Sequence, residues 1–256
     1  MVPTSVSPSV RVVCQAHEAA NELVLELVQQ FFDVTASWSI AEASERGHLD
    51  LVKELGETAP DGAVSDALDF AAEAGNLEVV RWLTANRSEC CSIDAMDMAA
   101  ANGHLDMVLY LHTHRHEGCS TDAMDLAAAN GFLPVVKWLH HHRLEGCTTA
   151  SMDEAAVSGH LDVVKWLHCH RGEGCSKDAL LDACHAGHSD VVRWLMQFRT
   201  EGSATTAIHA ATQGGHFELV QWLVDHAFLR DNYAPPPRHI TMYYESDEEE
   251  AYKTIR

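Results

Sequence analysis

The sequence predicts an all-α fold, a solenoid of stacked antiparallel helix pairs, and three observations support this fold class. First, seven glycines recur at a constant spacing of 28 residues, namely Gly47, Gly75, Gly103, Gly131, Gly159, Gly187 and Gly215. Such a fixed period is the signature of a tandem array. Second, small residues recur before each glycine, and in most units a Val-Val-aromatic-Leu pattern follows it. Third, each expected helix is shorter than the ~12–15 residues that an isolated helix needs, so the helices must stabilise one another.

The first helix of the unit is clearest in the segment from Thr121 to Cys147, where we expect it over Asp122–Asn130. Asp122 is a good N-cap, and Asp125 three positions later can return the hydrogen bond in the manner of a capping box. Gly131 suits the left-handed residue that ends such a helix. We expect the same capping role for the aspartates aligned with Asp125, which are Asp69, Asp97 and Asp153.

The second helix is expected from about Leu133 to His141. Pro134 fits its first turn, where the missing N–H costs nothing. Most other units carry an acid there, which complements the positive end of the helix dipole. An aromatic residue recurs inside this helix in six units, at Trp82, Tyr110, Trp138, Trp166, Trp194 and Trp222. We expect the aromatics of the central units to contribute most to stability, because a central unit has two interfaces.

The ends of the chain differ from the middle, as caps of an array should. We expect residues 1–34 to form an N-terminal segment with a degenerate capping helix, read from Gln15 to Phe32. Residues 35–230 are expected to hold seven repeats, the first of which has an irregular loop, GETAPDGAVS. Residues 231–256 contain a run of prolines and many acids, which predicts a disordered acidic tail.

The repeated segments resemble the ankyrin repeat. The resemblance is carried by segments such as Ala99 to Leu111 and Ala155 to Leu167, which match the A-A, G-H-L-E and V-K-L-L elements of that family. It covers roughly Trp38 to Leu229. The ankyrin unit has about 33 residues, and the missing residues fall between the second helix and the next first helix. Ankyrin repeats carry a β-hairpin finger there, so we expect ankyrin-like helix pairs with shortened loops and little or no β-structure.

This resemblance implies a non-catalytic protein–protein interaction module. Its concave face would be formed by the first helices and the loops, and it would bind a protein partner whose identity the sequence does not give. The aspartates aligned with Asp125 would lend that face negative potential. We expect the partner to contact the variable positions at the ends of the first helices, which are Glu45, Arg46, Glu73, Asn102, Asn130, Ser158, His185 and Gln213.

Composition limits the other classes of function. The 38 acidic and 17 basic residues give a formal net charge of -21, which disfavours nucleic acids and anionic membranes, since both require a basic face. No apolar run approaches the ~18–20 residues of a membrane span, and the N-terminus lacks the apolar stretch of a secretory signal. We therefore expect an intracellular protein, cytoplasmic or nuclear, that is a monomer with no catalytic residues, cofactor or metal.

Cysteine and histidine recur with the repeat. Stacked helices lie about 8–10 Å apart, which is too far for a disulfide, so we expect a ladder of reduced, semi-buried thiols at Cys91, Cys119, Cys147 and Cys175. H-x-H pairs occur at the ends of three second helices: His112/His114, His140/His142 and His168/His170. We expect their protonated rings to cap the helix C-termini. Residues two apart diverge on a helix, which disfavours a zinc site.

Two further ladders are interpreted as structural. A histidine follows the glycine at five positions, where the resemblance implies hydrogen bonding between helices: His48, His104, His160, His188 and His216. Arginine and glutamate alternate in the loops, which predicts an ion-pair rail along one edge. Its members are Arg87, Arg115, Arg143, Arg171, Arg199, Glu89, Glu117, Glu145, Glu173 and Glu201.

Two alternative functions stay open at this point. One is a metal-binding or enzymatic protein that uses the histidine and cysteine rows. The other is a scaffold or inhibitor that is regulated through the acidic tail, where Ser246 precedes acidic residues in the manner of a kinase site.

Overall fold

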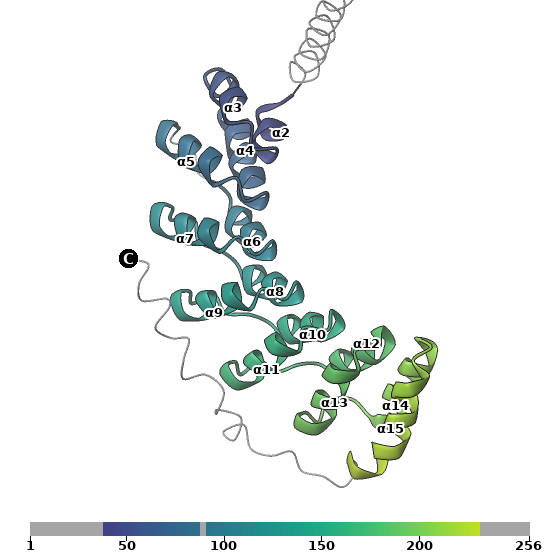
Figure 1. The fold of residues 1–256 in the computed structure, drawn as a ribbon. Coiled ribbons are helices and arrows are strands. Elements are labelled where there is room, and N and C mark those ends of the chain that lie inside the picture. The colour runs from purple at the N-terminus through teal and green to yellow at the C-terminus, as the bar shows by residue number, and fades with distance from the viewer. Residues whose placement is uncertain (1–37, 88–90, 231–256) are drawn as a thin grey trace, which may run out of the picture.

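The computed structural model describes residues 38–87 and 91–230, and within them every regular element is a helix. Seven helix pairs follow one another along the chain (Figure 1). The first helices of the pairs are α2 (Ile40–Glu45), α4 (Asp61–Glu73), α6 (Asp94–Ala101), α8 (Asp122–Ala129), α10 (Ala150–Val157), α12 (Asp178–Ala186) and α14 (Ala204–Gln213). The second helices are α3 (Leu49–Gly56), α5 (Leu77–Asn86), α7 (Leu105–His114), α9 (Leu133–His142), α11 (Leu161–His170), α13 (Ser189–Phe198) and α15 (Phe217–Arg230).

The all-α prediction is therefore confirmed, and no strand occurs in the described ranges where hairpin fingers could have formed. The expected capping helix in residues 1–34 and the acidic tail lie outside the described residues, so the division of the chain into three parts stays a prediction. The irregular loop expected in the first repeat is wrong in part. Residues 61–65 of the loop GETAPDGAVS belong to α4, because Pro60 provides an extended residue just before the first turn.

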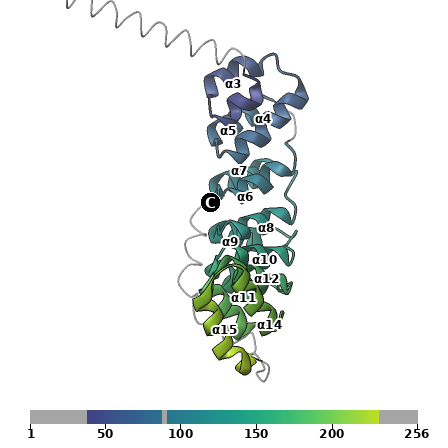
Figure 2. The same cartoon turned by 90° about the vertical axis from the view of Figure 1, so that its right-hand side faces the viewer.

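The helix pairs stack in a single curved column (Figures 1 and 2). The first helices follow the inner side of the curve and pack directly on one another, whereas neighbouring second helices touch little. Ala99 and Ala100 in α6 are fully buried, and the equivalent alanines recur in the neighbouring first helices. Because these side chains are small, the first helices approach closely, and this closer spacing makes their side of the column concave.

The bulkier core residues come from the second helices. Trp138 and Trp166 are each 4 % exposed and Trp194 is also buried. Trp82 and Trp222, nearer the ends of the column, are only partly buried. Tyr110 is partly buried as well, so the aromatic row is a core feature chiefly in the fourth to sixth repeats.

The repeated glycine is required for two reasons, as Gly131 shows. It has a φ of +79°, which side chains rarely adopt, and it follows the last residues of α8 as expected. A Cβ there would also lie 2.5 Å from Nδ1 of His160, the residue that follows the next glycine. The expected hydrogen bond from this histidine position is confirmed at His216, whose ring contacts the carbonyl oxygen of His185 at 3.0 Å. The His160 ring instead lies against Gly131 of the preceding repeat.

The predicted capping box at Asp122 and Asp125 is wrong. The N-cap position of α8 is Thr121, and the backbone N–H of Asp122 donates to Ser120 Oγ at 3.0 Å. The Asp125 carboxylate lies against the next repeat, where it accepts hydrogen bonds from the Thr148 N–H at 2.9 Å, the Thr148 hydroxyl at 2.6 Å and the Ser151 hydroxyl. Asp125 therefore links two repeats rather than ending its own helix.

The same inter-repeat link occurs at the aligned aspartates, so the capping role is wrong for them as well. Asp97 accepts from the Ser120 N–H at 2.9 Å and from its hydroxyl at 2.6 Å. The equivalent distances to the backbone N–H of the next loop are 3.0 Å for Asp69 and 2.8 Å for Asp153. Burial raises the pKa of Asp97 even though the Ser120 hydrogen bonds oppose that change.

Candidate partner-binding face

Each first helix turns one strip of side chains away from the core, toward the concave side. In α4 the residues Ala67, Leu68, Ala71 and Ala72 are buried, whereas Asp66, Phe70 and Glu73 are exposed. The apolar row consists of Phe70 and its equivalents in the next two first helices, Met98 and Leu126. The aspartate row consists of the exposed residues Asp66, Asp94, Asp122 and Asp178, and Ala150 interrupts it.

Charge is segregated between the two sides of the column. None of the first helices α2 to α14 in the described ranges contains a lysine or an arginine. The basic residues of these ranges lie on second helices, as Lys53 and Arg81 do, or in loops and caps, as Arg143 does. The concave face therefore combines apolar side chains with carboxylates, and this arrangement favours a cationic partner over an anionic one.

All eight residues predicted to contact a partner are exposed. They come from two neighbouring registers of the repeat rather than from one. Four lie in the register of Glu73, and these are Glu45, Glu73, His185 and Gln213. The other four lie one residue later, at the caps of the first helices, and these are Arg46, Asn102, Asn130 and Ser158.

The side chains of three of these eight residues also make contacts within the protein. The side chain of Asn102 donates to the carbonyl oxygen of Glu73 at 3.1 Å, and Asn130 donates to that of Ala101 at 2.8 Å. Each asparagine therefore links its repeat to the preceding one. The guanidinium of Arg46 lies 4.8 Å from the centre of the Trp38 ring. For the side chains at the other five positions, the structure shows no comparable hydrogen bond or ring contact among the described residues.

The source of negative potential differs from the expected one. Asp97 and Asp125 are buried and directed at the next loop, so they do not line the concave surface. The exposed carboxylates are instead those of the aspartate row, three residues earlier on each helix. The sequence contained the signal for this, because positions 67, 68, 71 and 72 are all apolar and helical periodicity then places 66, 70 and 73 outside.

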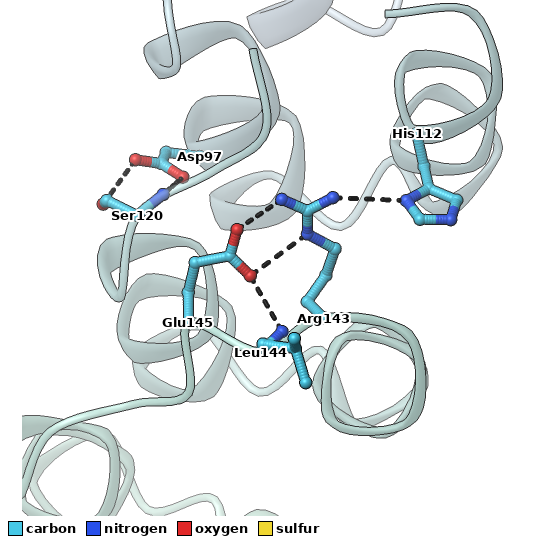
Figure 3. Close-up of polar contacts among 6 residues, drawn as sticks. All are labelled: Asp97, His112, Ser120, Arg143, Leu144 and Glu145. Carbon is cyan, nitrogen blue, oxygen red and sulfur yellow. Dashed lines mark hydrogen bonds and ion pairs between the residues drawn. The ribbon is translucent and has the colours of Figure 1, made fainter. Parts of the chain in front are cut away.

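A second arrangement lies where the second helices end and the loops to the next first helices begin, and Figure 3 shows it around Arg143. Its Nη1 lies 3.4 Å from Nδ1 of His112 in the preceding repeat, and its Nε lies 3.2 Å from Oε2 of Glu145. The same carboxylate oxygen accepts from the Leu144 N–H at 3.0 Å. The arrangement recurs at Arg171 and Arg199, with His140 and His168 as the neighbours. We call this series the arginine–histidine rail.

Four of the predicted arginine–glutamate pairs are confirmed, those of Arg115, Arg143, Arg171 and Arg199, but they are less exposed than a surface ion-pair ladder. Glu89 lies outside the described residues, and Arg87 pairs with Asp61. The Arg143 side chain is 20 % exposed, and it passes over Gly118, where a Cβ would meet Nη2 at 2.6 Å. Burial tends to raise the pKa of Glu145, but its hydrogen bonds with Arg143 and the backbone outweigh this and lower it. Because each guanidinium already has a carboxylate and an imidazole, the rail is poorly suited to binding anions.

The H-x-H pairs divide into two roles. The second histidine of each pair caps its helix as expected, since Nδ1 of His142 lies 2.9 Å from the carbonyl oxygen of Trp138 and His170 makes the same contact with Trp166 at 2.8 Å. The expectation is wrong for the first histidine. His112 accepts from an arginine, which requires a neutral ring, and burial together with the Arg143 charge lowers its pKa.

The cysteine ladder is confirmed as a set of free, buried thiols at Cys91, Cys119, Cys147 and Cys175. Burial raises the pKa of Cys119 to about 11, so its thiol stays protonated at neutral pH. In the described part of the chain, no three or more His, Cys, Asp or Glu side chains are grouped so that they could hold a metal ion. The four thiols of the ladder belong to the hydrophobic core.

Comparisons with known proteins agree with the geometry. A family model described as ankyrin repeats (3 copies) matches residues 95–177 and 152–234, and one described as ankyrin repeats (many copies) matches residues 68–112. No curated protein matches the chain significantly. Within the described residues, no helix has both the length and the apolar character of a membrane span. Ankyrin repeats are generally protein–protein interaction modules and are generally non-enzymatic. The three-copy model alone covers more than half of this chain, which therefore belongs to the ankyrin-repeat family.

Proposed function

We propose that this chain is a non-catalytic binding module that recognises a protein through the concave face of its first helices and loops. The observation that carries the proposal is the composition of that face. In α4, α6 and α8 it presents an aspartate and an apolar side chain four residues apart, and none of the first helices in the described ranges contains lysine or arginine. A surface that only had to stay soluble would not need to separate its charges in this way.

The stack also holds this strip in a fixed shape. The Asp125 links and the arginine–histidine rail join each central repeat to its neighbour, so few side chains must be ordered when a partner binds. A specific contact needs about 800 Å² on each partner, which several adjacent repeats can supply. In this proposal the binding residues are the strip and the eight exposed positions at the helix ends. The protein acts inside the cell as a monomer and binds no nucleic acid.

The proposal is tested with arginine substitutions on the two sides of the column. The concave variant carries Ser158→Arg, His185→Arg and Gln213→Arg, which spare the structural asparagines. The control variant carries His141→Arg and Gln197→Arg at exposed positions of second helices. Circular dichroism establishes that both variants fold.

A protein recovered by cross-linking to the wild-type chain should be lost by the concave variant and kept by the control. Equal recovery by both variants would overturn the assignment of the face. Loss from both variants would contradict it as well, because binding would then not distinguish the two sides.

A further inference from the structure

The aspartate row and the apolar row run side by side along the concave face. Asp94 and Met98 are four residues apart in α6, as Asp122 and Leu126 are in α8. Residues four apart on a helix share a face and are separated by about 6 Å along its axis. In α4 the apolar member, Phe70, is 43 % exposed. A ligand on this face would therefore meet one carboxylate and one apolar side chain in each of three successive repeats.

These carboxylates differ from the acids elsewhere on the molecule that have a basic partner. Asp50 pairs with Lys53 at 3.4 Å and Asp61 pairs with Arg87 at 3.1 Å. Among the described residues, no ion pair reaches the aspartate row. Asp122 and Asp94 add to the effect of burial in raising the pKa of Asp97, which shows that their charges act together. A cation placed along this row would relieve that repulsion.

The spacing of the repeats indicates the form of the ligand. Packed helices are about 8–10 Å apart, so the two rows repeat at about that distance. A polyproline II segment advances about 3.1 Å per residue with three residues per turn, and thus returns a side chain to the same side every ~9.3 Å. An α-helix rises 1.5 Å per residue, and its closest return to one side near this distance is seven residues, or ~10.5 Å. The extended segment matches the rows better.

We propose that this strip binds an extended segment of a partner protein in which a lysine or arginine recurs at every third residue beside an apolar residue. The inference rests on the proposed function and adds the chemistry of the partner. The basic side chains pair with Asp66, Asp94 and Asp122, and the apolar ones cover the apolar row. The chain's own residues 231–256 carry the acidic run ESDEEE, so they do not complement the strip.

The test uses fluorescence anisotropy with the full chain and a labelled peptide of repeated Lys-Leu-Pro triplets. Peptides of Glu-Leu-Pro and Lys-Ser-Pro triplets probe the charge and the apolar contact separately. The protein variants are Asp94→Asn with Asp122→Asn, and Phe70→Ser. The matched control is Asp106→Asn with Asp162→Asn, which removes the same charge from exposed first-turn residues of second helices.

The Lys-Leu-Pro peptide should bind the wild type and the control alike, and added salt should weaken it. Loss of two ion pairs should weaken binding to the Asp94/Asp122 variant by about tenfold. Phe70→Ser should weaken Lys-Leu-Pro binding but leave the weaker Lys-Ser-Pro binding unchanged. Equal binding of the Glu-Leu-Pro peptide, or an equal loss in the control, would overturn the proposal.

Failure of this inference is separable from failure of the proposed function. If no triplet peptide binds but the concave arginine variant still loses its cross-linked protein, the partner chemistry is wrong and the binding face stands. If neither experiment distinguishes the concave from the second-helix variants, both proposals are wrong.

Discussion

Replacing Asp125 with alanine tests whether the repeats are joined by the aspartate links. Asp125 is 8 % exposed and accepts three hydrogen bonds from Thr148 and Ser151 of the next repeat. Asp122 lies three residues earlier on the same helix and is exposed. The two substitutions thus remove the same group from the same helix, once at an inter-repeat contact and once at the surface.

The expected loss follows from the contacts. A hydrogen bond to a charged group contributes about 1.5–3 kcal/mol, and a buried donor left without a partner costs about 1–3 kcal/mol. The two hydroxyls can turn to other acceptors, but the Thr148 N–H is fixed. Removing the desolvation cost of the buried carboxylate offsets part of the loss. We therefore expect Asp125→Ala to lower the free energy of unfolding by about 3 kcal/mol, and Asp122→Ala by about 0.5 kcal/mol through the helix dipole.

Urea unfolding followed by circular dichroism measures both values. Asp125→Asn serves as a third variant, since its amide oxygen can still accept from the Thr148 N–H, and it should lose roughly half as much as alanine. Similar losses of about 1 kcal/mol for Asp122→Ala and Asp125→Ala would indicate a local helix cap instead. That result would refute the inter-repeat link.

Three further predictions concern the core, the rail and the thiols. Trp138→Ala should lower the free energy of unfolding by about 3–5 kcal/mol and Trp222→Ala by clearly less, because Trp138 is buried whereas Trp222 is only partly buried. Equal small losses in urea unfolding would contradict this. The pKa of His112 is lowered by folding, so the stability it contributes is present above its ordinary value of 6.5 and lost as pH falls below it. Urea unfolding on both sides of pH 6.5 should show a smaller pH dependence for His112→Gln than for the wild type, and an unchanged slope would count against the rail. Cys119, with a pKa of about 11, should react with iodoacetamide at neutral pH more slowly than the partly exposed Cys169, as mass spectrometry of the labelled peptides would show.

The features that could be predicted from the sequence are those determined by residues within a single repeat. Gly131, Pro134 and the alternation of small and bulky residues depend on backbone conformation and helical periodicity, and all lie where expected. The role of Asp125 could not be read in this way. An aspartate three residues into a helix has the same spacing whether it caps its own helix or accepts from another loop. The choice depends on how the loop 23 residues later passes over it.

The candidate site was anticipated only in part. The ends of the first helices, such as Ser158 and His185, are exposed as predicted. Variation between repeats indicates the helix ends but not the aspartate row, because Asp94 and Asp122 are the same residue in successive repeats. The role of His112 does not follow from its own repeat, because its arginine partner lies 31 residues away, in the next repeat. Contacts at such separations depend on the stacking distance, which no single repeat determines.

The constant offsets of the links bear on how such a chain can grow. Asp125 reaches 23 residues forward and Arg143 reaches 31 residues back, and both contacts stay between adjacent units. Duplication of the gene segment that encodes one 28-residue repeat would therefore also reproduce these hydrogen bonds between the new repeat and its neighbours. The array could gain or lose repeats by recombination without any change to the contacts between repeats. Each added copy would extend the concave surface by one repeat.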